Sequence, residues 1–238
     1  NKEQLVSVEE ALSMKNDSPE ANEKIISALG RPPESDGDVG WNRTMTRAIP
    51  SDVKSTNPLM ISSTAEFEVL GLTGFGLFTF DWNFTPYADS RYVKSWQASK
   101  DRLYDKVGMR DDAVWSDGTP ITAHDIAFSF QTIMNPKIPI PAVRSGTDQI
   151  RWVQAYDDYT VVYFHKEPLA TNVWNVNFPV IPKHVYDDSI PHDFTMAQSE
   201  HHLKYERNPV CGGPYEIVKR VEKQEIVLER REDWYMRD

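Results

Sequence analysis

Five short runs rich in β-branched and aromatic residues are the feature that most constrains this chain, because such residues favour pleated, half-buried strands. The runs are YVKSWQ (92–97), IRWVQAY (150–156), YTVVYFH (159–165), YEIVKRV (215–221) and EIVLER (225–230). Asp157 and Asp158 alone separate the second run from the third, and the polar residues 222–224 separate the fourth from the fifth. Gaps of this length and composition predict two β-hairpins.

The clearest helix signal follows Thr122. Thr122 and Asp125 form a variant of the capping box, in which a hydroxyl and a carboxylate satisfy free backbone N–H groups at the start of a helix. Apolar residues then recur at helical spacing until Asn135 and Pro136 end the run: Ile126, Ala127, Phe130, Ile133 and Met134. Strand runs that alternate with such helices predict an α/β fold, with mixed sheets and flanking helices.

The first 40 residues form a separate segment. Ser18, Pro19 and Glu20 are typical of a helix start, and Gly30 is typical of a helix end, so residues 1–29 are expected to be helical. The stretch PPESDGDVG (32–40) has the composition of an acidic surface linker. We therefore expect a helical N-terminal segment and linker over residues 1–40 and one folded domain over residues 41–238.

Composition narrows the classes of partner. Acidic residues outnumber basic ones 36 to 26, and the net charge of -10 argues against binding to nucleic acid or to anionic lipid. The sequence has no apolar run of membrane-spanning length and no signal-peptide pattern at its start. A single cysteine, Cys211, excludes an internal disulfide but does not decide the cellular compartment.

Histidines and acid pairs offer little support for catalysis or metal binding. None of the six histidines has metal-ligand spacing, and adjacent residues such as His201 and His202 point to different sides of a helix. A surface role is favoured for this pair, and a cap or surface role for His124. Three Asp-Asp pairs, at 111–112, 157–158 and 187–188, fall at predicted turns, so turn formation is favoured over a glycosidase site.

Nucleophile and nucleotide motifs are also lacking. No GxSxG elbow is present, and residues 74–76 (GFG) are too short for a nucleotide loop, so a sharp turn from helix to strand is favoured there. No cationic residue adjoins Cys211, which favours a small, semi-buried thiol in a tight turn over a reactive one. The sequence predicts no catalytic residue, no metal site and no cofactor, and therefore no enzyme.

The segment VWSDGTPITAHDIAFSF (114–130) is very similar to the signature of family 5 extracellular solute-binding proteins, which bind oligopeptides, dipeptides or nickel for ABC importers. Further family elements follow in order: NPL (57–59), GLF (76–78), residues 103–110, DYTVV (158–162), VIPKH (180–184) and CGGPY (211–215). The resemblance covers nearly all of residues 41–238. In physical terms these elements look like scaffold, with Asp117 and Gly118 suited to a turn and Trp115 and Phe130 suited to core anchors.

The resemblance implies a type II periplasmic binding protein-like fold, of which this chain is the first-lobe portion of a two-lobed protein. It further implies capture of a peptide or similar small solute outside the cytoplasmic membrane and delivery to an ABC permease. Nickel chelates and oligosaccharides remain alternative ligands. Membrane contact is expected only through an anchor or the permease. The alternative is a sensing or protein-interaction module built on the same fold, with residues 1–29 as its contact segment.

The resemblance also implies ligand-contacting residues. Peptide binders of the family line their cleft with the loop that here holds Ser62, Ser63 and Thr64, and a tyrosine near the lobe crossover, here Tyr215, can face ligand. The alternative to ligand contact is that residues 62–64 form an ordinary surface loop and that Tyr215 is packed in the core. This chain departs from the family at Phe75, where glutamate is frequent, and at Cys211, where glycine is frequent. With one lobe present, the isolated chain is expected to bind ligand weakly at most.

Overall fold

The computed structural model describes Ser7, residues 44–80 and residues 85–234. The helix and linker expected over residues 1–40 lie outside the described residues, Ser7 apart. The described helices are α3 (Thr64–Thr73), α4 (Ala123–Met134), α5 (Pro141–Thr147), α6 (Asn172–Asn175), α7 (Lys183–Tyr186), the 3-10 turn η2 (Ile190–His192) and α8 (Glu200–Arg207). The strands are β1 (Phe78–Phe80), β2 (Pro86–Ala88), β3 (Val93–Ala98), β4 (Tyr104–Met109), β5 (Ile150–Asp157), β6 (Thr160–His165), β7 (Tyr215–Val221) and β8 (Glu225–Arg230).

The main sheet has four strands in the order β3-β4-β6-β5. Both predicted hairpins are confirmed: β5 pairs with β6, and β7 pairs with β8 in a separate two-stranded sheet. The turn lies one residue later than predicted, at Asp158 and Tyr159, because Asp157 still pairs with Thr160 as the last residue of β5. The Asp157 carboxylate accepts the Tyr159 N–H at 2.8 Å and stabilises this turn. All strand pairings among the described residues are antiparallel.

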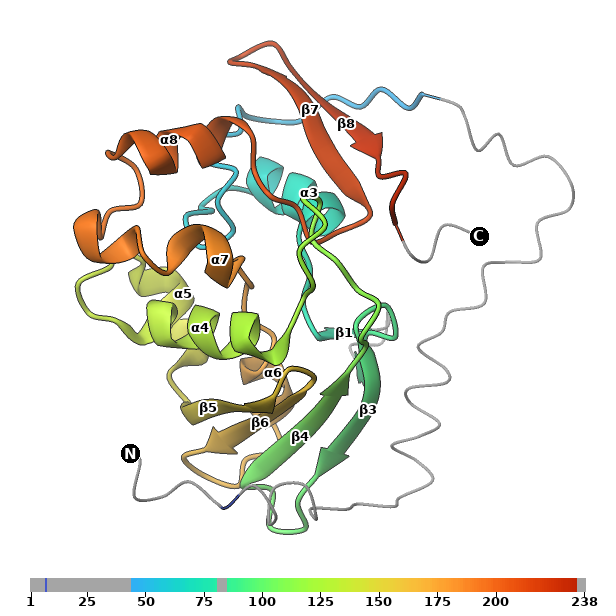
Figure 1. The fold of residues 1–238 in the computed structure, drawn as a ribbon, viewed down its shortest axis with the longest axis vertical. Coiled ribbons are helices and arrows are strands. Elements are labelled where there is room, and N and C mark those ends of the chain that lie inside the picture. Colours follow the sequence, from blue (N-terminus) through green and yellow to red (C-terminus); the bar gives the residue numbers. More distant parts are fainter. Residues whose placement is uncertain (1–6, 8–43, 81–84, 235–238) are drawn as a thin grey trace, which may run out of the picture.

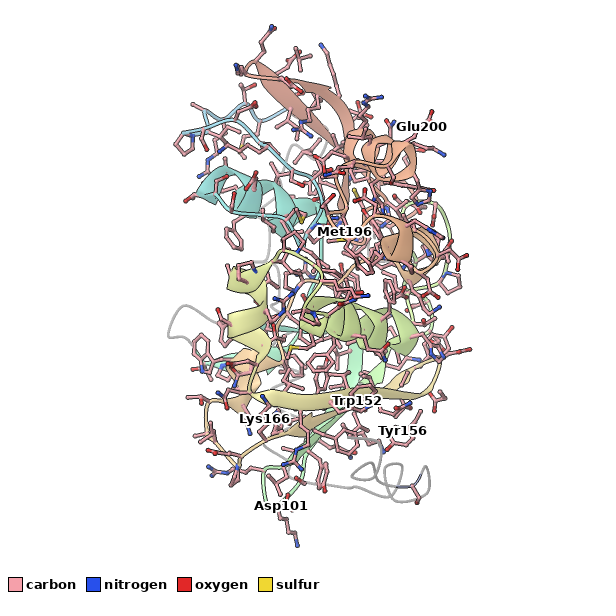
Figure 2. All side chains as sticks on the ribbon, turned by 90° about the vertical axis from the view of Figure 1, so that its left-hand side faces the viewer. Asp101, Trp152, Tyr156, Lys166, Met196 and Glu200 are labelled. Atoms are coloured by element: carbon pink, nitrogen blue, oxygen red, sulfur yellow. The ribbon has the colours of Figure 1, made fainter. Side chains whose placement is uncertain are left out.

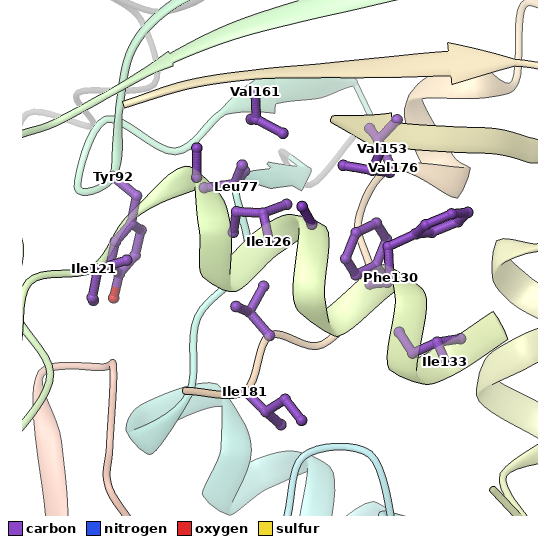
Figure 3. Packing of buried hydrophobic residues seen from close by; sticks show 14 of the residues in the cluster. Leu77, Tyr92, Ile121, Ile126, Phe130, Ile133, Val153, Val161, Val176 and Ile181 are labelled. Atoms are coloured by element: carbon purple, nitrogen blue, oxygen red, sulfur yellow. The ribbon is translucent and has the colours of Figure 1, made fainter. Parts of the chain in front are cut away.

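Helix α4 covers one face of the main sheet and confirms the predicted helix. The Asp125 carboxylate accepts the Thr122 N–H at 2.8 Å, as the capping box requires, and also the Lys183 N–H at 2.8 Å, which ties α7 to the start of α4. Ile126 and Phe130 project from α4 toward the strands that carry Val153 and Val161 (Figure 3). The expected core anchors Trp115 and Phe130 are each 2% exposed.

The main sheet and the β7–β8 sheet lie at opposite ends of the molecule, with α4 and α7 between them (Figure 1), and β1 and β2 form a third, two-stranded sheet. Helix α3 packs beneath β7 and β8, where Val53, Ala65 and Val69 form a small core separate from the main one. Asp101 lies at the far tip of the β3–β4 connection, remote from α8 (Figure 2). Within the described part of the chain, no helix is long and apolar enough to cross a membrane.

Replacement of Ile126 by alanine should lower the free energy of unfolding by about 2–5 kcal/mol, because the side chain is fully buried and its removal leaves a cavity. Gln131→Ala is the matched control, since Gln131 is exposed on the same helix and should change stability by less than about 0.5 kcal/mol. Urea unfolding of both variants measures the difference. Equal stabilities would contradict the assignment of Ile126 to the main core.

Candidate functional site

The loop that precedes α3 is held in one conformation by its own hydrogen bonds. Ser63 is the N-cap of α3, and its hydroxyl accepts the Glu66 N–H at 3.3 Å. In return, Glu66 Oε2 accepts the N–H groups of Ser62 at 2.6 Å and Ser63 at 2.8 Å, which completes a capping box. Ser62 and Thr64 are exposed and Ser63 is half-buried. We call residues 62–64 the candidate ligand loop.

Glu66 ties this loop to a second segment of chain. Its Oε1 accepts the N–H groups of Lys54 at 2.9 Å and Ser55 at 3.1 Å, although the residue is only 2% exposed. Burial raises the pKa of Glu66, but the hydrogen bonds from Ser62, Ser55, Ser63 and Lys54 outweigh burial and hold the pKa below its ordinary value. The carboxylate therefore stays ionised and keeps the candidate ligand loop in register.

Tyr215 lies at the other end of α3. The Gly213 N–H donates to the Thr73 carbonyl at 2.8 Å, so the chain that leads into Tyr215 joins the last turn of α3. The candidate ligand loop leads into the first turn, and its last residue, Thr64, is the first residue of α3. A ten-residue helix is about 15 Å long, so the structure places the two predicted contact regions at opposite ends of α3 and does not bring them into contact. Tyr215 is partly buried as the first residue of β7.

Residues 211–214, here called the anchor loop, contact several distant elements. The Tyr92 hydroxyl donates to the Gly212 carbonyl at 2.9 Å, and the Ser116 and Cys211 backbones are linked by a bond of 2.8 Å from Ser116 N to Cys211 O. Arg231 donates to the Cys211 carbonyl at 3.2 Å and to the Gly213 carbonyl at 3.1 Å. The anchor loop thus joins the family signature, the end of α3 and the end of β8.

The two departures from the family pattern meet at this loop. Phe75 stacks on Tyr92, with 4.4 Å between ring centroids, and packs edge-on against Trp115 at 5.3 Å. Cys211 is 3% exposed, and burial raises the pKa of its thiol to about 11. The thiol is thus more deeply buried than the semi-buried thiol that the sequence predicted. A small recess borders the anchor loop and is lined in part by Leu70, Gly74 and Pro209.

The prediction of a surface role is wrong for His202. Its side chain is fully buried, with Nδ1 2.9 Å from Asp193 Oδ2 and Nε2 2.9 Å from Ser189 Oγ. His201 is exposed, as expected, and so is His124, whose Nε2 lies 3.2 Å from Asp158 Oδ1. Sequence spacing could not reveal the burial of His202, because α8 must first pack against η2. In the ranges that the structure describes, no three His, Cys, Asp or Glu side chains are grouped to hold a metal ion.

Comparison with known proteins places this geometry in a family. The family described as bacterial extracellular solute-binding proteins, family 5 Middle, matches residues 90–238. The periplasmic oligopeptide-binding protein OppA of Salmonella typhimurium is 26% identical over 211 residues, which cover 81% of this chain and 37% of that protein.

Two solved structures agree with the fold. Campylobacter jejuni NikZ in complex with Ni(L-His) is 26% identical, with a TM-score of 0.62 over 77% of this chain and 34% of that one. Listeria monocytogenes OppA bound to peptide is 18% identical, with a TM-score of 0.65 over 78% of this chain and 38% of that one. The fold is therefore that of the type II periplasmic binding protein-like proteins.

The chain belongs to the bacterial extracellular solute-binding proteins of family 5. It spans little more than a third of the length of the relatives that it matches.

Glu66→Gln should lower the free energy of unfolding at pH 7 by about 1–3 kcal/mol, because one amide oxygen cannot replace two carboxylate oxygens that accept four backbone N–H groups. The folded pKa of Glu66 lies below the ordinary value of 4.5, so its stabilisation is full above that pH and is lost as the pH falls through the folded pKa. Below pH 4.5, the stability of the variant should therefore depend less steeply on pH than that of the wild type.

Urea unfolding at several pH values measures both effects. Glu68→Gln is the control, because Glu68 lies two residues after Glu66 on α3 and forms a surface ion pair with Arg47. Parallel pH profiles for the wild type and Glu66→Gln would contradict the assigned role.

Gly212→Ala should destabilise the protein by about 1–3 kcal/mol, because a Cβ at this position would overlap the Phe75 ring and lie 2.9 Å from Trp115 Cζ3. A Phe75→Leu background should reduce that cost, so the two changes should be non-additive in a double-mutant cycle. Gly146→Ala is the control, since a Cβ there meets open space. If the two changes in the free energy of unfolding were additive, the Phe75 ring would not pack against Gly212.

Proposed function

We propose that this chain is the first-lobe portion of an extracellular or periplasmic solute-binding protein, which captures an oligopeptide or similar small solute for an ABC importer. Family membership supports the solute-binding role, and the named relatives include oligopeptide-binding and dipeptide-binding proteins as well as a structure with a nickel-histidine complex. The observation that carries the proposal is the candidate ligand loop, whose backbone is held by Glu66 while Ser62 and Thr64 stay exposed.

The contact residues are proposed to be Ser62, Ser63, Thr64 and Tyr215. Ser62 and Thr64 are exposed, and the Ser62 hydroxyl makes a long hydrogen bond of 3.4 Å to Glu66 Oε2. The Ser63 hydroxyl caps α3 and is partly engaged. Loop rigidity favours affinity because little conformational entropy is lost when ligand binds. The length of α3, about 15 Å, matches an extended peptide of about four or five residues, which could reach from the loop to Tyr215.

The charge near the candidate ligand loop is suited to peptides of varied sequence. Glu66 is buried and its oxygens are occupied by backbone N–H groups, and Glu68 pairs with Arg47 at 2.9 Å. Neither carboxylate therefore selects strongly for a basic side chain. Small hydroxyl groups can form hydrogen bonds with the main chain of a bound peptide, which all peptides share.

Partners follow from the same proposal. A second lobe would complete the cleft, a permease would receive the solute, and contact with the membrane would occur through that permease or an anchor. Residues 41–238 would form the lobe portion and residues 1–40 a spacer before it. The family consists of binding proteins, and we propose no catalytic role and no cofactor for this chain.

A thermal-shift and calorimetric screen of the full-length protein tests the proposal, with three probe sets: tri- to pentapeptides, nickel-histidine and oligosaccharides. Peptides should raise the melting temperature, and Ser62→Ala together with Thr64→Ala should weaken peptide binding by about tenfold, the loss expected for about one hydrogen bond per residue. The same pair should leave the melting temperature without ligand nearly unchanged, because both side chains are exposed. Ser63→Ala is the contrast, since loss of the cap should lower stability by about 1 kcal/mol. If no compound in the three probe sets bound to the protein, the proposal would be ruled out.

A further inference from the structure

The segment 53–56 is held between two carboxylates that come from different helices. On one side, Glu66 of α3 accepts the Lys54 and Ser55 N–H groups. On the other side, Glu206 of α8 accepts the Thr56 N–H at 2.8 Å through Oε1 and the Ser55 hydroxyl at 2.9 Å through Oε2. The Glu206 backbone carbonyl also accepts the Thr56 hydroxyl at 2.8 Å. Residues 150 or 151 positions apart in sequence are thus joined by three hydrogen bonds.

Arg220 of β7 completes the network around Glu206. Its Nη1 lies 2.8 Å from Glu206 Oε1, and its Nη2 donates to the carbonyl groups of Val53 at 2.5 Å and Lys54 at 3.0 Å. The two side chains are only 17% and 24% exposed. Hydrogen bonds between ionised groups shielded from water are stronger and less screened by salt than those on an open surface.

Helix α8 is itself fixed at its start. Ser199 caps the helix, and the buried His202 side chain contacts both Asp193 and Ser189, as described above. His202 and Glu206 are four residues apart, so they lie on the same face of α8. That face points into the protein at both positions. The packing of α8 therefore helps to fix the position of Glu206 independently of the segment that it contacts.

We propose that Glu206 is a positioning residue for the candidate ligand loop, acting through Ser55 and Glu66, an inference that rests on the proposed function. The contacts form a continuous series: Glu206 holds Ser55 and Thr56, Ser55 N–H bonds to Glu66, and Glu66 holds the N–H groups of Ser62 and Ser63. When Glu206 is replaced, the 53–56 segment loses one of its two supports. Glu66 then has a less rigid partner, and the loop samples conformations that do not fit ligand.

This role differs from a purely structural one in what it predicts. A structural contact would change the melting temperature and leave the affinity of folded molecules unaltered. A positioning contact changes affinity at temperatures where all molecules are folded, and it exposes specific amides. The Ser62 and Ser63 N–H groups are the informative amides, because Glu66 is their hydrogen-bond acceptor and Glu206 does not touch them.

The test compares Glu206→Gln with wild type in the full-length protein, and the peptide probe is an equimolar pool of tri- to pentapeptides. Gln offers one acceptor oxygen in place of two, and its uncharged amide group cannot form an ion pair with Arg220. Calorimetry well below the melting temperature should show binding weakened about three- to thirtyfold, the range for coupling through hydrogen-bonded networks. Hydrogen exchange should become faster at Ser62 and Ser63 but not at Ile126 in α4.

Glu200→Gln is the matched control, because Glu200 lies exposed on the outer side of α8 (Figure 2) and should behave as wild type in both measurements. Thr56→Val removes only the hydroxyl bond to Glu206 and serves as a milder variant should Glu206→Gln fail to fold. Weaker binding with faster exchange at Ser62 and Ser63 supports the inference. If wild type binds peptide and the variant shows unchanged affinity or unchanged exchange, this inference is overturned while the proposed function stands. If wild type binds no probe, the proposed function fails and this inference fails with it.

Discussion

The structure depends most on the anchor loop and on the buried guanidinium that holds it. Arg231 is 1% exposed and donates to three backbone carbonyls, those of Cys211, Gly213 and Val114. Asp233 pairs with it at 2.8 Å and offsets the cost of its burial. Since the anchor loop also binds the end of α3 and the family signature, one cation links elements that are otherwise more than a hundred residues apart.

Buried carboxylates repeat this arrangement elsewhere in the fold. Glu66, Asp125 and Asp193 are each at most 8% exposed, and each accepts backbone N–H groups from more than one position. An ionised acceptor strengthens such bonds, which is how loops without regular structure become rigid. In a binding protein this rigidity has a use, because a loop that is already ordered loses little entropy on contact with ligand.

Local features were predictable where neighbouring residues alone decide them. The capping box at Thr122 and Asp125, the hairpin of β5 and β6, and the strand runs depend on hydrogen bonds and side-chain preferences within a few residues. The family signature likewise made the fold class predictable. The burial of His202 was not predictable, because its partners Asp193 and Ser189 are brought to it by the packing of η2 against α8.

By itself, the sequence determined the α/β class, the helix α4, the five strand runs that became β3, β5, β6, β7 and β8, the family, and which residues are candidates for ligand contact. Only the tertiary structure decided that Ser62 and Tyr215 lie at opposite ends of α3, and that Glu66 and Glu206 support the candidate ligand loop from two sides. The physical reason is that capping and pairing act over a few residues, whereas these carboxylates act across contacts between distant segments. Such contacts exist only after the chain has packed.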